Sequence, residues 1–254
     1  MKRKGIALLL LSFVFLLGVV VNVSAHEPDS VFQVSVIGAI SGGVYDGAMN
    51  LGDLAKHGDF GLGATHELAG ELVVVDGKFY QFGVDGRARL LLADDTVTFA
   101  AVTFFEPEIS LEIDGVLSQE DLEAQLLDLI ENKNIIHAIS VTGRFAHIKA
   151  RTPSRQTKPY RPLAEVLAEQ AEHDFYDVTG TMVGFWTPDY LASVHSPGFH
   201  FHFVVDEGQA NADGAQGGHV LTYEIEGAHL SIDAKDQLEI WFPTNDPEFQ
   251  NLEL

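Results

Sequence analysis

At residues 197–203 the sequence reads Pro197-Gly198-Phe199-His200-Phe201-His202-Phe203, in which aromatic and imidazole side chains alternate. Successive side chains of a β-strand point to opposite faces, so this alternation predicts a strand with phenylalanines on one face and two histidines on the other. On such a strand the Cα atoms of His200 and His202 lie about 7 Å apart. Two imidazoles on one rigid, apolar strand are well placed to bind a single metal ion.

A third histidine, His219, follows the pair Gly217-Gly218 and begins the next apolar run. Three neutral imidazole nitrogens suit Zn²⁺ or another divalent ion and leave positions free for substrate or water. Histidine pairs with this spacing also occur on strands as half-buried polar residues, but the third histidine favours a metal site. The remaining histidines lack such spacing, and we expect surface or capped positions for His57, His66, His137, His147, His173, His195 and His229.

The sequence on either side of this stretch contains further strand and helix signals. Short runs of apolar and β-branched residues predict strands at residues 31–40, 71–75, 78–82, 96–105, 135–148, 179–186, 219–225, 230–233 and 237–242. Asp76-Gly77 predicts a hairpin between two of them. Ser118 is a good N-cap for a helix over residues 118–131, and Pro162 begins a second over residues 162–172. Residues 51–56 indicate a helical turn, and the glycine-rich residues 57–63 a loop.

These elements predict an α+β fold with mixed, largely antiparallel sheets. The two halves also share an order of features: a short helix, an Asp-Phe pair and a strand led by glycine, at Gly70 and Gly180. This order predicts two similar α/β units, a duplicated motif. We therefore expect an N-terminal domain over residues 26–150 and a C-terminal domain over residues 151–254 that contains the metal histidines.

The N-terminus has the three parts of a secretory signal peptide. Lys2, Arg3 and Lys4 precede an almost unbroken apolar run over residues 6–21, and Val23-Ser24-Ala25 is a small-residue cleavage pattern. We expect residues 1–25 to be removed and the protein to be exported, either periplasmic or extracellular; the alternative is an uncleaved anchor. The sequence has no cysteine. Its stability after export must therefore come from the core and a bound metal rather than from disulfides.

The net charge of −22 bears on possible partners. Such an acidic chain repels nucleic acid and anionic lipid, so we expect no nucleic-acid partner and no membrane association after signal cleavage.

Two further residues are candidates for chemistry. Glu71 begins the apolar run Glu71-Leu72-Val73-Val74-Val75, where a carboxylate beside a core needs a partner or a purpose. Arg151 lies in the basic segment of residues 149–155, and a guanidinium can bind a substrate carboxylate through two parallel hydrogen bonds. The alternatives are an exposed carboxylate at a strand end and a solvated basic loop.

The sequence resembles the alpha-acetolactate decarboxylase family along nearly the whole chain after the signal peptide. The matching motifs keep their order: Val44-Tyr45-Asp46-Gly47, His57-Gly58-Asp59-Phe60-Gly61-Leu62-Gly63, Gly70-Glu71-Leu72, Asp76-Gly77-Lys78-Phe79-Tyr80, Thr103-Phe104-Phe105, Arg151-Thr152, Gly184-Phe185, Pro188-Asp189-Tyr190, Gly198-Phe199-His200-Phe201-His202-Phe203 and Gly217-Gly218-His219.

The resemblance implies a zinc-dependent carboxy-lyase that converts 2-acetolactate to acetoin and CO₂. It implies that His200, His202 and His219 are the zinc ligands, that Glu71 and Arg151 are catalytic, and that the fold is a two-domain α+β homodimer of bacterial origin. In this chemistry the metal is an electron sink for the carbon that loses CO₂. Arg151 would orient the substrate carboxylate and Glu71 would manage the proton delivered to carbon.

The sequence departs from the family pattern in three places. Ala64-Thr65 stands where the family more often has Thr-Phe, and Ala69 stands where it usually has an acidic residue. The stretch between His202 and His219 is longer than is typical of the family. Family members also have a metal-reaching glutamate near the C-terminus, whereas Glu248 and Glu253 lie in no matching motif here.

Two rival functions follow from these departures and from local spacing. The spacing from His200 and His202 to Glu207 and Gly214 is also that of the first cupin motif, although the second is missing downstream. The other rival is a non-catalytic exported protein that binds a metal or a small acid and retains the decarboxylase fold. An assay of acetoin formation separates catalysis from binding.

The small-residue pattern that ends at Ala25 predicts that the exported protein begins at or near His26. Intact-mass measurement on exported protein checks this. A mass that still includes residues 1–25 would contradict the prediction.

Overall fold

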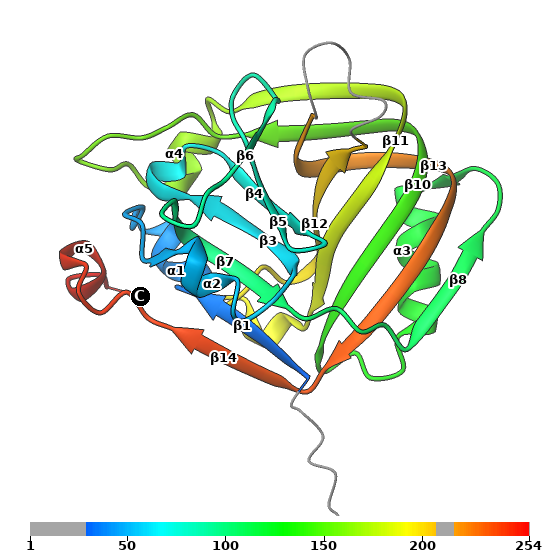
Figure 1. The fold of residues 1–254 in the computed structure, drawn as a ribbon, viewed down its shortest axis with the longest axis horizontal. Helices are drawn as coiled ribbons and strands as arrows, with labels where there is room; N and C mark the ends of the chain where they lie inside the picture. Colours follow the sequence, from blue (N-terminus) through cyan, green and yellow to red (C-terminus); the bar gives the residue numbers. More distant parts are fainter. Residues whose placement is uncertain (1–28, 207–215, 254) are drawn as a thin grey trace, which may run out of the picture.

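The computed structural model describes residues 29–206 and 216–253 (Figure 1). The predicted signal peptide, residues 1–25, and the Glu207 and Gly214 of the cupin alternative lie outside the described residues. About half of the described chain forms two β-sheets. The helices are α1 (Ile37–Ser41), α2 (Leu51–Leu54), α3 (Gln119–Leu129), α4 (Leu163–Leu167) and α5 (Pro247–Gln250), with 3₁₀ turns η1 (His66–Leu68) and η2 (Asp189–Leu191). Within these residues, no helix is both long and apolar enough to cross a membrane.

The first sheet combines strands from both ends of the described chain. Its order is β14-β1-β7-β3-β4-β5-β6, and β2 pairs with β7. All pairings are antiparallel except β1 with β14, which is parallel. The bounds are β1 (Ser30–Val34), β2 (Met49–Asn50), β3 (Phe60–Thr65), β4 (Glu71–Val75), β5 (Lys78–Phe82), β6 (Ala88–Leu90), β7 (Thr96–Thr103) and β14 (Gln237–Trp241).

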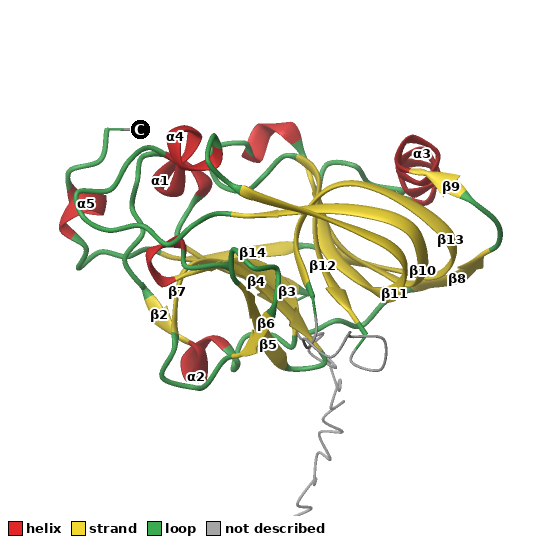
Figure 2. Ribbon diagram, turned by 90° about the horizontal axis from the view of Figure 1, so that it is seen from above, coloured by secondary structure: helices red, strands yellow, loops and turns green. Residues whose placement is uncertain are grey.

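The second sheet is built around long antiparallel strands that curve across the molecule (Figure 2). Because β13 pairs with both β10 and β12, the strands β10, β11, β12 and β13 form a closed circuit of hydrogen-bonded neighbours. The shorter β8 and β9 add to β13. The bounds are β8 (Ile109–Ile113), β9 (Leu117–Ser118), β10 (Ile136–Thr152), β11 (Ala171–Thr187), β12 (Gly198–Val205) and β13 (Gly217–Lys235).

One apolar core joins the two sheets. Val73 of β4 and Phe82 of β5 belong to the same buried cluster as Val183 and Phe185 of β11. The neighbours of Val73 along β4, Leu72 and Val74, point the other way into a separate cluster with α2. The unbroken apolar run of β4 follows from this position, because the strand is buried on both faces.

Several predicted elements are confirmed. The sheets are mixed and largely antiparallel, and β4 and β5 form a hairpin whose turn residues Asp76 and Gly77 both have positive φ, as a two-residue hairpin turn requires. Helix α3 begins after Ser118, whose hydroxyl accepts a hydrogen bond from the Asp121 backbone N–H. The predicted duplication stays a prediction, since the two sheets differ in strand order.

Other predicted elements need correction. The helix predicted over residues 162–172 ends at Leu167, because residues 171–174 instead pair with β10. The strand predicted over residues 31–40 ends at Val34, since Ser35 has a φ of 65° and α1 follows. The division into domains over residues 26–150 and 151–254 stays a prediction. Residue 150 lies inside β10, and β14 joins the first sheet.

The segment predicted as a loop at residues 57–63 contains the start of a buried strand, β3. A Cβ atom at Gly63 would lie 2.2 Å from the Phe99 carbonyl oxygen of β7, and one at Gly61 would lie 2.1 Å from that of Ala101. These glycines therefore permit a close approach of two backbones, a role that in sequence cannot be told from turn formation.

We expect Gly63→Ala to lower the free energy of unfolding by about 1–3 kcal/mol, because backbone atoms of β7 must move to admit the methyl group. Gly83→Ala is the control, since its Cβ would meet only the flexible Asp85 side chain, at 3.4 Å. Urea unfolding measures both. Equal stability of the Gly63→Ala variant and the unaltered protein would contradict the proposed close approach.

Candidate metal centre and active site

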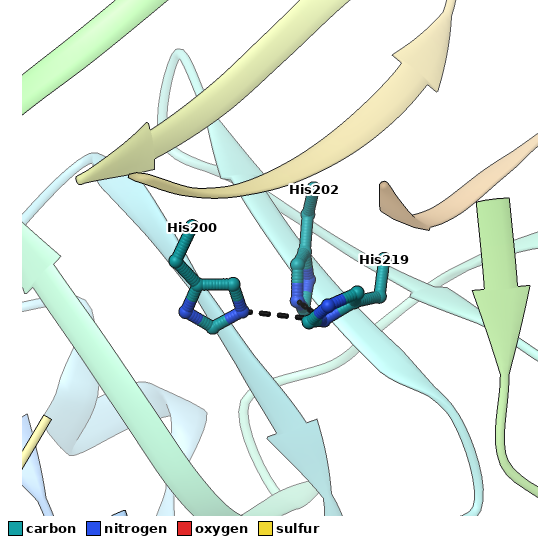
Figure 3. Close-up of side chains that lie close together, drawn as sticks. All are labelled: His200, His202 and His219. Atoms are coloured by element: carbon teal, nitrogen blue, oxygen red, sulfur yellow. Dashed lines mark hydrogen bonds between the residues drawn. The ribbon is translucent and has the colours of Figure 1, made fainter. Parts of the chain in front are cut away.

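The three predicted histidines meet in space (Figure 3). His200 and His202 project from β12, and His219 from β13, where it pairs directly with His202 across the two strands. The Nε2 atoms of His200 and His202 each lie 3.2 Å from Nδ1 of His219. The predicted strand alternation therefore places the imidazoles as expected, and the strand pairing adds the third.

The hydrogen atoms on these rings cannot satisfy all three nitrogens. Nδ1 of His202 donates to the Leu72 carbonyl oxygen at 2.8 Å, which leaves Nε2 of His202 with a lone pair directed at His219. His200 and His202 both approach the same nitrogen of His219. With neutral rings, one hydrogen on that nitrogen cannot make two linear bonds. At least one of the two close approaches to His219 therefore lacks a good hydrogen bond. A cation between the rings would remove this conflict, because all three nitrogens could then direct lone pairs toward it.

Burial keeps all three rings neutral. It lowers the pKa of His202 to about 3, an effect that the Leu72 hydrogen bond opposes and nearby Arg151 reinforces. Burial also holds the pKa of His200 and His219 well below the usual range, aided by the neighbouring rings and Arg151. Neutral imidazole is the form that binds a metal. Nitrogens bound to one tetrahedral Zn²⁺ lie about 3.3 Å apart, close to the spacing here.

Glu71 and Arg151 connect the first sheet to this cluster. Arg151, at the end of β10, directs Nη1 to Glu71 Oε1 at 3.3 Å, and its Nη2 lies 3.3 Å from both ring nitrogens of His219. Glu71 Oε2 lies 3.6 Å from Nε2 of His202. The Glu71 side chain is only 7 % exposed, and burial raises its pKa to about 7 despite the opposing effect of Arg151. Glu71 can therefore hold or release a proton near neutral pH.

These polar groups line a cavity of about 180 Å³. The rest of its lining is mostly apolar and comes mainly from the first sheet, η1, α1 and α4: Ile37, Ile40, Leu68, Phe99, Leu163 and Leu167. The cavity thus has the composition of a site for a small organic molecule, with a few converging polar groups in an apolar wall.

Among residues 29–206 and 216–253, two other groups of potential ligands consist of carboxylates that already pair with a lysine. In the group of Asp29, Glu108 and Asp233, the buried ammonium of Lys235 lies 3.2 Å from Asp29 and 2.7 Å from Asp233. Asp46, Asp246 and Glu248 are partly exposed, and Lys158 bridges the first and last. Neither glutamate considered from the C-terminal region lines the histidine cavity: Glu248 pairs with Lys158, and Glu253 is exposed.

Most of the other histidines are surface or capped residues, as expected. For example, His147 pairs with Asp174 and His229 with Glu112. His137 and His195 are exceptions, being 3 % and 0 % exposed. The sequence holds no signal for the burial of His195, because it lies in the short segment between η2 and β12 and outside any periodic pattern.

The alpha-acetolactate decarboxylase family model matches residues 31–254. An alpha-acetolactate decarboxylase of Methanosarcina mazei is 38% identical, over 92% of this chain and 78% of its own, and that of Bacillus licheniformis is 38% identical, over 87% and 85%. The crystal structure of alpha-acetolactate decarboxylase from Bacillus subtilis strain 168 superposes with a TM-score of 0.83 at 36% identity, covering 88% of this chain and 93% of that one.

The geometry predicts about one divalent ion per chain at the histidine cluster. We expect His202→Ala to lose bound Co²⁺ or Zn²⁺, because it removes a ligand and the ring that the Leu72 carbonyl orients. His229→Ala, at an exposed site, should retain the metal. Elemental analysis and the Co²⁺ absorption spectrum measure this. Full occupancy in a His200→Ala, His202→Ala double variant would place the metal elsewhere.

Proposed function

The chain belongs to the alpha-acetolactate decarboxylase family, and we propose that it converts 2-acetolactate to acetoin and CO₂ with a divalent ion, zinc or a similar metal, held by His200, His202 and His219. The observation that carries this proposal is the meeting of these neutral histidines with Arg151 and Glu71 at one small, apolar cavity. A metal ligand set, a cation for a carboxylate and a proton-carrying acid are the groups that this decarboxylation needs.

The substrate carries a carboxylate, a hydroxyl and a keto oxygen on adjacent carbons. When bound, a divalent ion supplies a Lewis acid that draws electrons toward the keto oxygen as the C–C bond to the carboxylate breaks. Arg151 presents a charged donor fork toward the cavity and would bind and orient the substrate carboxylate. Since Arg151 also contacts Glu71 and His219, its guanidinium fixes the carboxylate relative to the other reacting groups.

Glu71 is suited to supply the proton. Loss of CO₂ leaves an electron pair that a proton must capture at carbon, and with a pKa of about 7 a large share of the carboxyl groups are protonated at neutral pH. After the transfer, Glu71 regains a proton from solvent. The contact with Arg151 limits the rise in the pKa of Glu71, so that the protonated and ionised forms of this carboxyl group both remain accessible.

The apolar lining supports the same reaction. Leu68, Phe99 and Leu163 surround the cavity with hydrocarbon, which packs against the methyl groups of the substrate and excludes water. In such surroundings an ionised carboxylate is poorly solvated, whereas departing CO₂ is neutral, so the surroundings favour loss of CO₂.

The alternatives have less support. The cupin reading leaves the motifs of the N-terminal half unexplained, whereas the family match spans residues 31–254. A non-catalytic binding protein would retain the metal without turnover, which the activity assay distinguishes.

We also propose, from the family resemblance and the N-terminal sequence, that the chain is an exported homodimer. Sedimentation of the exported protein tests this assembly.

We expect Glu71→Gln and Arg151→Lys to lower acetoin formation about 10²–10⁴-fold while bound metal stays near the unaltered level, because neither residue is among the three ligands. Arg151→Lys keeps the charge but removes the planar donor fork. Discontinuous acetoin assays with parallel metal analysis measure both effects.

Each variant has a control of the same residue type, and the arginine control lies on the same strand as Arg151. Arg144→Lys alters an exposed arginine of β10, and Glu253→Gln an exposed carboxylate, so both should retain activity. Unaltered acetoin formation in either Glu71→Gln or Arg151→Lys would refute the roles proposed here. A loss in Glu253→Gln as large as that in Glu71→Gln would instead assign Glu253 to the site.

A further inference from the structure

His195 is a buried polar residue with no evident partner. It follows η2, and its backbone N–H donates to the Leu191 carbonyl oxygen at 2.9 Å. Its ring is 0 % exposed, lies against Phe99 and Phe185, and has no hydrogen bond at either nitrogen. A buried polar side chain without a partner costs free energy, so its retention needs a physical reason.

His200 also has a buried ring nitrogen without a hydrogen-bond partner. Its Nε2 faces the histidine cluster, while Nδ1 is buried and has no hydrogen-bond partner. His202 differs, because its Nδ1 donates to the Leu72 carbonyl oxygen and its tautomer is therefore fixed. If His200 presents an Nε2 lone pair to a metal, its hydrogen must be on Nδ1, and that hydrogen requires an acceptor.

His195 can provide the acceptor. The ring centroids of His195 and His200 lie 6.4 Å apart, compared with 4.8 Å for His200 and His219, whose nearest ring nitrogens are 3.2 Å apart. The wider separation is too long for a direct bond, but two hydrogen bonds of about 2.8 Å through one water span such a gap. The phenylalanines around His195 offer no competing acceptor.

We propose that His195 is a positioning residue: one of its ring nitrogens accepts, through a single water, the Nδ1 hydrogen of His200 and so fixes the tautomer that directs the Nε2 lone pair of His200 to the metal. This inference rests on the proposed metal ligation by His200. Burial lowers the pKa of His195 to about 4, so a neutral ring with one acceptor nitrogen is present under ordinary conditions. Direct ligation is a separate possibility that the geometry disfavours, since His195 is not in the compact group of ligand atoms.

The test compares three variants in the full-length protein. His195→Phe fills the space but removes both nitrogens, and His195→Asn keeps a hydrogen-bonding group. His137→Phe is the matched control, because His137 is also buried with an unpartnered Nδ1 but lines a different hollow, beside α3. The measurement is the Co²⁺ dissociation constant by competition with a chelator, together with thermal unfolding of the metal-free protein.

We expect His195→Phe to weaken Co²⁺ binding by about 10–100-fold, the usual effect of losing a group that orients a metal ligand. His195→Asn and His137→Phe should stay within about threefold of the unaltered protein. The metal-free His195→Phe protein should unfold at the same temperature as the unaltered protein or higher. A role in packing alone would lower the unfolding temperature and leave the metal affinity unchanged.

A second readout needs no metal. Nitrogen-15 NMR of the metal-free protein should show His200 with its hydrogen on Nδ1 and a mixture of tautomers in His195→Phe. Unchanged Co²⁺ affinity and an unchanged His200 tautomer in His195→Phe would overturn this inference alone. Failure of the unaltered protein to bind Co²⁺ at all would overturn the proposed metal site as well, so the two failures are distinguishable.

Discussion

The buried ion pair between Glu71 and Arg151 is the contact on which the site depends. It joins β4 of the first sheet to β10 of the second, within the apolar region where the sheets meet. Removing a carboxylate and a guanidinium from water costs free energy, and the attraction between the two groups offsets this cost only when they lie close together. The adjacent hydrogen bond from His202 to the Leu72 carbonyl oxygen spans the same boundary, so the histidine cluster and the Glu71–Arg151 pair share one support.

The charge balance of the cavity also differs from that of the whole chain. The protein has a net charge of −22, yet the cavity combines a guanidinium with three neutral rings and a single carboxyl group of raised pKa. Net charge therefore predicts the behaviour of the surface and says little about the interior. A small anion inside the cavity would meet the positive charge of Arg151, and the low polarity there would strengthen the interaction.

The local parts of the fold could be predicted from sequence, and the parts that depend on distant pairing could not. Asp76-Gly77 and the Ser118 cap act through neighbouring backbone, so the hairpin and α3 were predictable. The end of α4 at Leu167 depends on β10, and the strand character of β3 depends on β7. In the site, alternation along β12 predicted that His200 and His202 share a face, whereas the burial of His195 follows from packing against Phe99 and Phe185.

The parallel pairing of β1 with β14 has a consequence for how the chain is made. These strands lie near opposite ends of the described sequence, and β14 completes the edge of the first sheet beside β1. During synthesis β1 leaves the ribosome long before β14, so for most of that time the backbone donors and acceptors along this edge have no partner. An open strand edge can pair with other chains. The nascent protein therefore remains prone to aggregation until β14 has been synthesised. A chaperone that binds extended chains would be most useful during that interval.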